Sequence, residues 1–124
     1  MSTDRRVVAL RGANTVEAND EAAIVAATAE LVAELLARND VAPEDLISIL
    51  FTATPDLDAE FPAAAARGLG ISQVPLLCAR EIPVAGAMPR VVRVLMHLYS
   101  DHDYASLRHV YLGGARSLRE DLAE

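Results

Sequence analysis

The chain has 124 residues, of which 52% are hydrophobic and only 4% aromatic, and its formal net charge is −7. A chain of this length suits a single domain, and its hydrophobic content excludes a disordered protein. An acidic chain without a basic run is a poor partner for nucleic acid or for anionic membranes.

The first part of the chain predicts a strand followed by a long helix. Residues 7–10 are a short β-branched run that ends at a turn over residues 11–14. A helix then begins at Asn19 or Asp20, either of which can cap it, and continues with apolar residues at helical spacing. It ends near Asn39, which we expect to adopt the left-handed closing conformation.

The rest of the chain predicts a short helix and four strands. The helix covers residues 61–67, with Pro62 in its first turn. The strands are apolar runs over residues 46–54, 74–81, 90–99 and 108–112. The first of these runs is nearly uncharged, which is typical of a strand covered on both faces. This order predicts one α/β (α+β) domain, with a mixed β-sheet and its helices on one side.

Composition also bears on compartment and assembly. The lone cysteine, Cys78, excludes an internal disulfide and fits a reducing cytosol. Residues 1–6 precede no apolar signal core, and uncharged stretches such as 46–55 are too short to span a bilayer. We therefore expect a soluble, cytoplasmic protein. Its many alanines bury little area each, so the core gains from burial against partner subunits.

Most templates for catalysis or metal binding are absent from the sequence. It contains no glycine-rich phosphate loop, and the three histidines (His97, His102 and His109) are scattered rather than clustered for a metal. A nucleophilic Cys78 paired with a histidine stays open, although a lone cysteine in a strand is usually a small hydrophobe. We expect no metal site.

Charged residues interrupt runs that otherwise resemble core. Arg93 lies within the apolar run 91–95, Arg11 ends the first predicted strand beside Gly12, and Glu81 ends the third. A buried arginine is costly unless a carboxylate or a ligand pairs with it. Two interpretations follow. In the structural one, Arg93 forms an ion pair with Glu81 or points out from a sheet edge. In the functional one, the arginines line a pocket for a small polyanion.

Six segments of the chain form a pattern in a fixed order, although each alone is weak. They are residues 10–17, 52–59, 61–63 with Arg67, 74–75 with Cys78 and Glu81, 93–96, and 108–112 followed by 118–119. Together they resemble the monofunctional chorismate mutases of Bacillus and related bacteria, across nearly the whole chain.

The resemblance implies a homotrimer whose strands form a pseudo-α/β barrel, with the active sites in clefts between subunits. It implies rearrangement of chorismate to prephenate in phenylalanine and tyrosine biosynthesis, with no cofactor. This one-step pericyclic reaction needs no nucleophile. An enzyme accelerates it by holding the reactive conformer and by placing fixed positive charge at the ether oxygen.

The resemblance also implies a role for each site residue. Arg93 would contact the ether oxygen of the breaking bond and a substrate carboxylate, while Arg11 and Tyr111 would bind carboxylate. Glu81 would accept from the ring hydroxyl, with Cys78 close by. The neighbouring subunit and the C-terminal tail would add further contacts, from Phe61, Ala63, Arg67, Leu118 and Arg119.

The sequence departs from the family pattern near the cleft and before the tail. Ala64 stands where family members often carry lysine, so a peripheral cation is missing. Gly113 and Gly114 replace a more charged, less flexible pair, ahead of a tail (120–124) that we expect to be mobile. The predicted core constellation is intact despite these differences.

Two other functions stay open. A non-catalytic trimeric binder of small carboxylates would keep the same cleft without turnover. A related trimeric fold that hydrolyses enamines or imines also holds a carboxylate with an interfacial arginine, but its sequence segments differ from the six above. Turnover of chorismate, as opposed to binding without turnover, distinguishes these functions.

Overall fold

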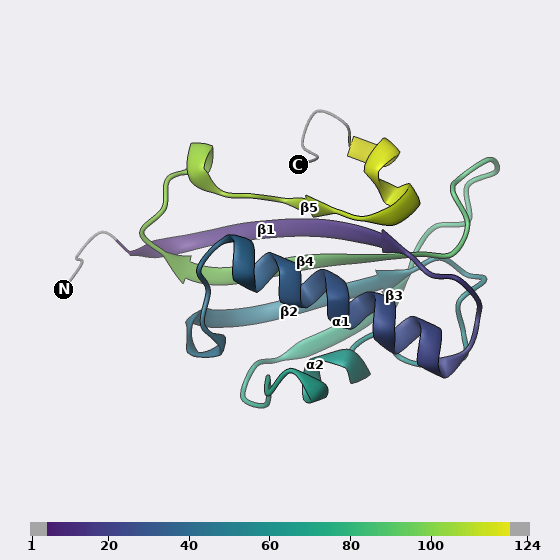
Figure 1. Ribbon diagram of the computed structural model, residues 1–124, viewed down its shortest axis with the longest axis horizontal. Helices are drawn as coiled ribbons and strands as arrows, with labels where there is room; N and C mark the ends of the chain where they lie inside the picture. Colours follow the sequence, from purple (N-terminus) through teal and green to yellow (C-terminus); the bar gives the residue numbers. More distant parts are fainter. Residues whose placement is uncertain (1–4, 120–124) are drawn as a thin grey trace.

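The computed structural model describes residues 5–119, which form a five-stranded sheet with helices on one face (Figure 1). The strands are β1 (Arg6–Thr15), β2 (Leu46–Ala53), β3 (Leu76–Arg80), β4 (Val91–Ser100) and β5 (Val110–Tyr111). Their order in the sheet is β3-β2-β4-β1-β5. The central β4 is antiparallel to β1 and β2, whereas β3 and β5 are parallel to their neighbours. The predicted mixed sheet is therefore confirmed. The predicted mobile tail (120–124) lies outside the described residues.

Helix α1 (Glu21–Arg38) begins and ends where the sequence predicts, but the left-handed closing conformation falls on another residue. The Asp20 side chain caps its first turn by accepting a hydrogen bond from the Ala23 N–H at 2.7 Å. The expectation for Asn39 is wrong, since its φ is −115° and the positive φ (54°) falls on Asp40. The Asn39 amide instead donates to the carbonyl oxygens of Leu35 (2.8 Å) and Arg108 (2.9 Å), which holds it in place.

Strand β1 continues five residues beyond the predicted end, because Gly12 does not form a turn. Gly12 lies within the strand and pairs with Val94 of β4 on one side and with Val110 of β5 on the other. A Cβ at this position would lie 2.5 Å from the Val110 carbonyl oxygen and 2.9 Å from Leu31 Cδ1. Glycine therefore permits the close approach of β5 and α1 to β1. As a result, Arg11 lies inside a strand and not at its end.

The remaining helices are short. They are η1 (Pro43–Asp45), α2 (Ala64–Gly68), η2 (Tyr104–Ser106) and η3 (Gly113–Arg119). Turns over residues 61–63 precede α2, so the helix predicted at 61–67 starts later than expected. The last predicted strand shortens to β5, and His109 lies just before it. No helix in the described residues combines the length and apolarity needed to cross a membrane.

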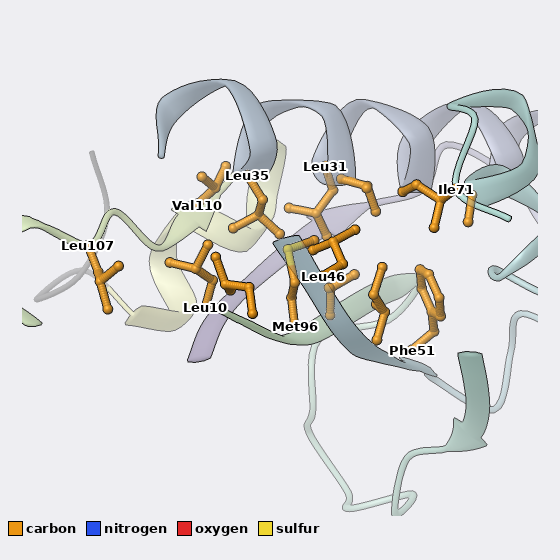
Figure 2. Packing of buried hydrophobic residues seen from close by; sticks show 14 of the residues in the cluster. Leu10, Leu31, Leu35, Leu46, Phe51, Ile71, Met96, Leu107 and Val110 are labelled. Carbon is orange, nitrogen blue, oxygen red and sulfur yellow. The ribbon is translucent and has the colours of Figure 1, made fainter. Parts of the chain in front are cut away.

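The hydrophobic core lies between the helices and one face of the sheet. Figure 2 shows Leu31 and Leu35 of α1 directed at the sheet, where Leu10, Phe51 and Met96 lie; all five are fully buried. Each such side chain contributes about 1.5–3 kcal/mol by leaving water. Because both α-helices pack on this face, the other face is open within the protomer.

The open face of the sheet exposes large apolar side chains. Val7, Leu77, Leu95 and Tyr99 are 52%, 60%, 38% and 50% exposed. Leu50 and Thr52 of β2, on the same face, are only half-buried. The prediction that this strand is covered on both faces is therefore wrong for a single protomer, because no helix covers this side.

Candidate functional site

Strand register gathers polar side chains on the open face. Arg11 of β1 pairs with Leu95 of β4, which pairs with Leu50 of β2. In the adjacent row, Arg93 of β4 pairs with Thr52 of β2. Since residues paired across strands point to the same face, these five side chains share the face away from the helices.

Arg93 and Glu81 form an ion pair on this face. Glu81 directly follows β3, where its backbone N–H donates to the Ala53 carbonyl oxygen at 3.0 Å. Arg93 Nε lies 3.0 Å from Glu81 Oε2, with side chains that are 41% and 18% exposed. The Thr52 hydroxyl donates to the same Oε2 at 2.7 Å. The predicted pairing is confirmed. Arg93 lies on the central strand, which rejects the interpretation that it points out from a sheet edge.

A cleft of about 430 Å³ opens above these residues. Its lining residues are Arg11, Gly12, Leu50, Thr52, Arg93, Val94, Leu95 and Tyr111. Tyr111 enters from β5, where it pairs with Ala13 and is 4% exposed. Two guanidinium groups and a phenol offer fixed charge and hydrogen-bond donors, which suits a ligand with carboxylate groups. The structure thus brings Arg11, Arg93 and Tyr111 together in one cleft, and Glu81 lies next to it through its ion pair with Arg93.

A second cleft, of about 370 Å³, contains others of the predicted site residues. Its lining residues are Ala53, Leu57, Asp58, Ala59, Glu60, Phe61, Pro62, Cys78, Ala79 and Arg80, none of which lines the first cleft. Phe61 is 71% exposed at its mouth. Cys78 pairs with the core residue Phe51 and packs against the main core, on the opposite face from Glu81 and Thr52. Within one protomer, Phe61 and Cys78 are therefore separate from Arg93.

The remaining predicted residues divide between α2 and η3. Ala63 packs half-buried against the main core, and Arg67 is exposed on α2. Leu118 packs in a cluster with Tyr111 and Ala115, which places η3 beside the first cleft. Arg119 is the last residue of η3, and its side chain lies outside the part of the chain that the structure describes.

The glycine pair that opens η3 is held by Thr15. Gly113 has a φ of 55°, and a Cβ there would lie 2.5 Å from Thr15 Oγ1. The Gly114 N–H donates to the same oxygen at 3.1 Å. The two glycines are thus part of a close contact that sets where η3 begins. Sequence reasoning treated them only as a more flexible pair.

The sequence segment 52–59 has two structural roles that sequence reasoning missed. Thr52 supports Glu81, as described above. Asp56 accepts from the Arg90 backbone N–H at 3.0 Å, while the Arg90 carbonyl oxygen accepts from the Val16 N–H at 2.8 Å. Arg90 has a φ of 51°, an uncommon value for a residue other than glycine. These contacts fix Arg90, the residue just before β4 and three positions before Arg93.

Comparison with known proteins gives a consistent result. The family model described as chorismate mutase type I matches residues 7–122. Chorismate mutase AroH of Thermus thermophilus is 48% identical over 114 residues, covering 91% of this chain and 93% of its own. Chorismate mutase AroH of Bacillus subtilis is 41% identical over 115 residues, covering 92% and 91%. The solved structure of a chorismate mutase from Clostridium thermocellum superposes with a TM-score of 0.87 at 45% identity, covering 89% of this chain and 98% of that one.

Proposed function

The chain belongs to the chorismate mutase type I family, and from this premise we propose how its residues perform the reaction and how its subunits assemble. The family activity is the isomerisation of chorismate to prephenate, a step toward phenylalanine and tyrosine. The substrate is a dianion, and negative charge grows on its ether oxygen as the C–O bond breaks. The first cleft contains the groups that such a reaction requires.

Arg93 is the proposed source of electrostatic stabilisation. A guanidinium has five N–H donors, and Nε is occupied by Glu81, so the terminal nitrogens are available to the ether oxygen and a neighbouring carboxylate. A fixed cation placed where charge develops lowers the barrier without any covalent step. Arginine suits this task because it does not lose its proton in a water-poor site.

Arg11, Tyr111 and Glu81 are the proposed binding groups for the rest of the substrate. Arg11 and the Tyr111 hydroxyl would bind carboxylate from β1 and β5, the strands that line one side of the cleft. Glu81 would accept a hydrogen bond from the ring hydroxyl. These contacts hold chorismate in its folded, reactive conformer, which lowers the entropic part of the barrier.

The assembly we propose is a homotrimer with each active site shared by two subunits. The exposed apolar side chains of the open face need a cover, and a second copy of the chain would supply it. The second cleft, with Phe61 and Cys78, would then close over the first cleft of the neighbouring subunit, with Arg67 nearby. Leu118 would cover the site from η3. The trimer would work in the cytoplasm, where the lone Cys78 stays reduced.

The observation that carries the proposal is the half-exposed Arg93 on the central strand, oriented by Glu81 and lying in one cleft with Arg11 and Tyr111. The test follows the loss of chorismate's ultraviolet absorbance on adding purified protein, with chelator present, and identifies the product. We expect rapid, chelator-insensitive formation of prephenate. A folded protein that binds chorismate without converting it would instead be a carboxylate binder, and the proposal would be wrong.

A further inference from the structure

The two carboxylate oxygens of Glu81 have different surroundings. Oε2 accepts a hydrogen bond from the Thr52 hydroxyl at 2.7 Å and forms the ion pair with Arg93 Nε at 3.0 Å. No hydrogen bond from the described residues reaches Oε1. One oxygen is therefore held by the protein, and the other is available to a ligand.

Glu81 needs such support because of its place in the chain. It follows β3, which is an edge strand, and Ile82 and Val84 beyond it are 81% and 63% exposed. Its long side chain has several rotatable bonds, whose freedom must be lost before the carboxylate can accept from a substrate in one geometry. Arg93 is half-exposed and, under the proposed function, also contacts the substrate. It therefore cannot serve solely to orient the Glu81 carboxylate.

Thr52 is suited to hold the carboxylate. It lies inside β2, next to the central strand, and it is in register with Arg93. A β-branched side chain is stiff at χ1, so its hydroxyl donates from a fixed point. Together the Thr52 hydroxyl and the Arg93 guanidinium hold the position of Oε2.

We infer that Thr52 is a positioning residue for the reaction: its hydroxyl holds Glu81 Oε2 so that Oε1 is presented to the substrate's ring hydroxyl. This inference rests on the proposed function, because it assigns Glu81 to substrate binding. Thr52 itself need not touch the substrate, and it acts through the orientation of the glutamate.

The test compares Thr52→Val, which keeps the shape and removes the donor, with Thr52→Ser, which keeps the hydroxyl. We expect Thr52→Val to lower kcat/KM roughly 10-fold, as the loss of a hydrogen bond to a charged group implies, while Thr52→Ser stays near wild type. Thr28→Val is the matched control, because among the described residues the Thr28 hydroxyl bonds only within α1, to the Ile24 carbonyl oxygen. Thermal midpoints and sedimentation of every variant separate a folding defect from a kinetic one. If Thr52→Val does not fold, Thr52→Ala against Thr52→Ser makes the same comparison.

A double-mutant cycle with Glu81→Ala supplies a readout that a merely structural role would not move. Without the carboxylate, Thr52 has nothing to orient, so the double variant should match Glu81→Ala in kcat/KM. The inference is overturned if Thr52→Val keeps wild-type kcat/KM, if serine fails to rescue, or if the loss persists undiminished without Glu81. Absence of chorismate turnover in the wild-type protein would instead refute the proposed function, so the two failures are distinguishable.

Discussion

Arg93 on β4 and Glu81 beyond β3 form their 3.0 Å ion pair across β2, the strand that lies between them in the sheet. The Arg93 side chain therefore runs along the open face and does not extend straight out of it. Its guanidinium is held at Nε from the β3 side, with Arg11 and Tyr111 lining the same cleft from β1 and β5. A cation fixed at one end in this way is prepared for the charge that develops in a rearranging ether.

Replacing Arg93 tests its electrostatic role. Arg93→Ala should fold normally and lower kcat by roughly 10²–10³-fold, the usual loss when one fixed donor to a developing oxyanion is removed. Arg93→Lys should also be poor, because an ammonium cannot bind the ether oxygen and a carboxylate in the bidentate way of a guanidinium. Arg38→Ala is the matched control, since within residues 5–119 Arg38 forms an ion pair only with Glu34 on α1. Steady-state kinetics decide, and more than a tenth of wild-type activity in Arg93→Ala would refute the assignment.

A charge on the open face tests the assembly. Leu95 is 38% exposed there, opposite Arg11, so Leu95→Glu would place a carboxylate that must lose its water in the otherwise apolar part of the proposed subunit interface. We expect the variant to sediment as a monomer and to lose activity. Ala26→Glu, exposed on α1, adds the same charge on the helix side and should stay trimeric. A wild-type monomer with full activity would contradict the interfacial sites.

Cys78→Ala separates packing from covalent chemistry. Cys78 is half-buried and packs against the main core, so its loss removes a small contact and no reacting group. We expect kcat within a few-fold of wild type and a destabilisation of about 1 kcal/mol, measured by chemical denaturation. An inactive but well-folded Cys78→Ala protein would revive the nucleophilic interpretation of this residue.

Gly113→Ala tests how η3 is positioned beside the first cleft. The new Cβ would meet Thr15 Oγ1, and the residue would have to keep a φ of 55°. We expect a cost of about 1–3 kcal/mol and a raised KM, because η3 carries Leu118 and Arg119. Gly68→Ala is the control, since a Cβ there has nothing within 4 Å. If both variants keep the wild-type KM and thermal midpoint, the Thr15 contact does not position η3.

The sequence predicts those features that depend on residues close together in the chain. The start of α1 at Asp20 and the apolar runs of the strands are of this kind. Gly12 was misinterpreted as a turn because its neighbours Leu31 and Val110 come together with it only in the folded sheet. Thr52 was missed for the same reason: it lies 29 residues from Glu81, and only the strand register brings them together. Local patterns did single out Arg93, Arg11 and Glu81 as charges among apolar runs, but their roles and the other site residues came from the family resemblance.

Complementation between two defective subunits tests the shared active site most directly. Arg93→Ala removes the cation of the first cleft, and Phe61→Glu places a carboxylate in the second, where it would repel a dianionic substrate. Each variant alone should be nearly inactive. When the two are co-expressed with different affinity tags and purified as mixed trimers, each mixed trimer has one site in about three that combines two intact halves, so activity should return in that proportion. Mixed trimers no more active than the separate variants would show that each site lies within a single subunit, and would contradict this account.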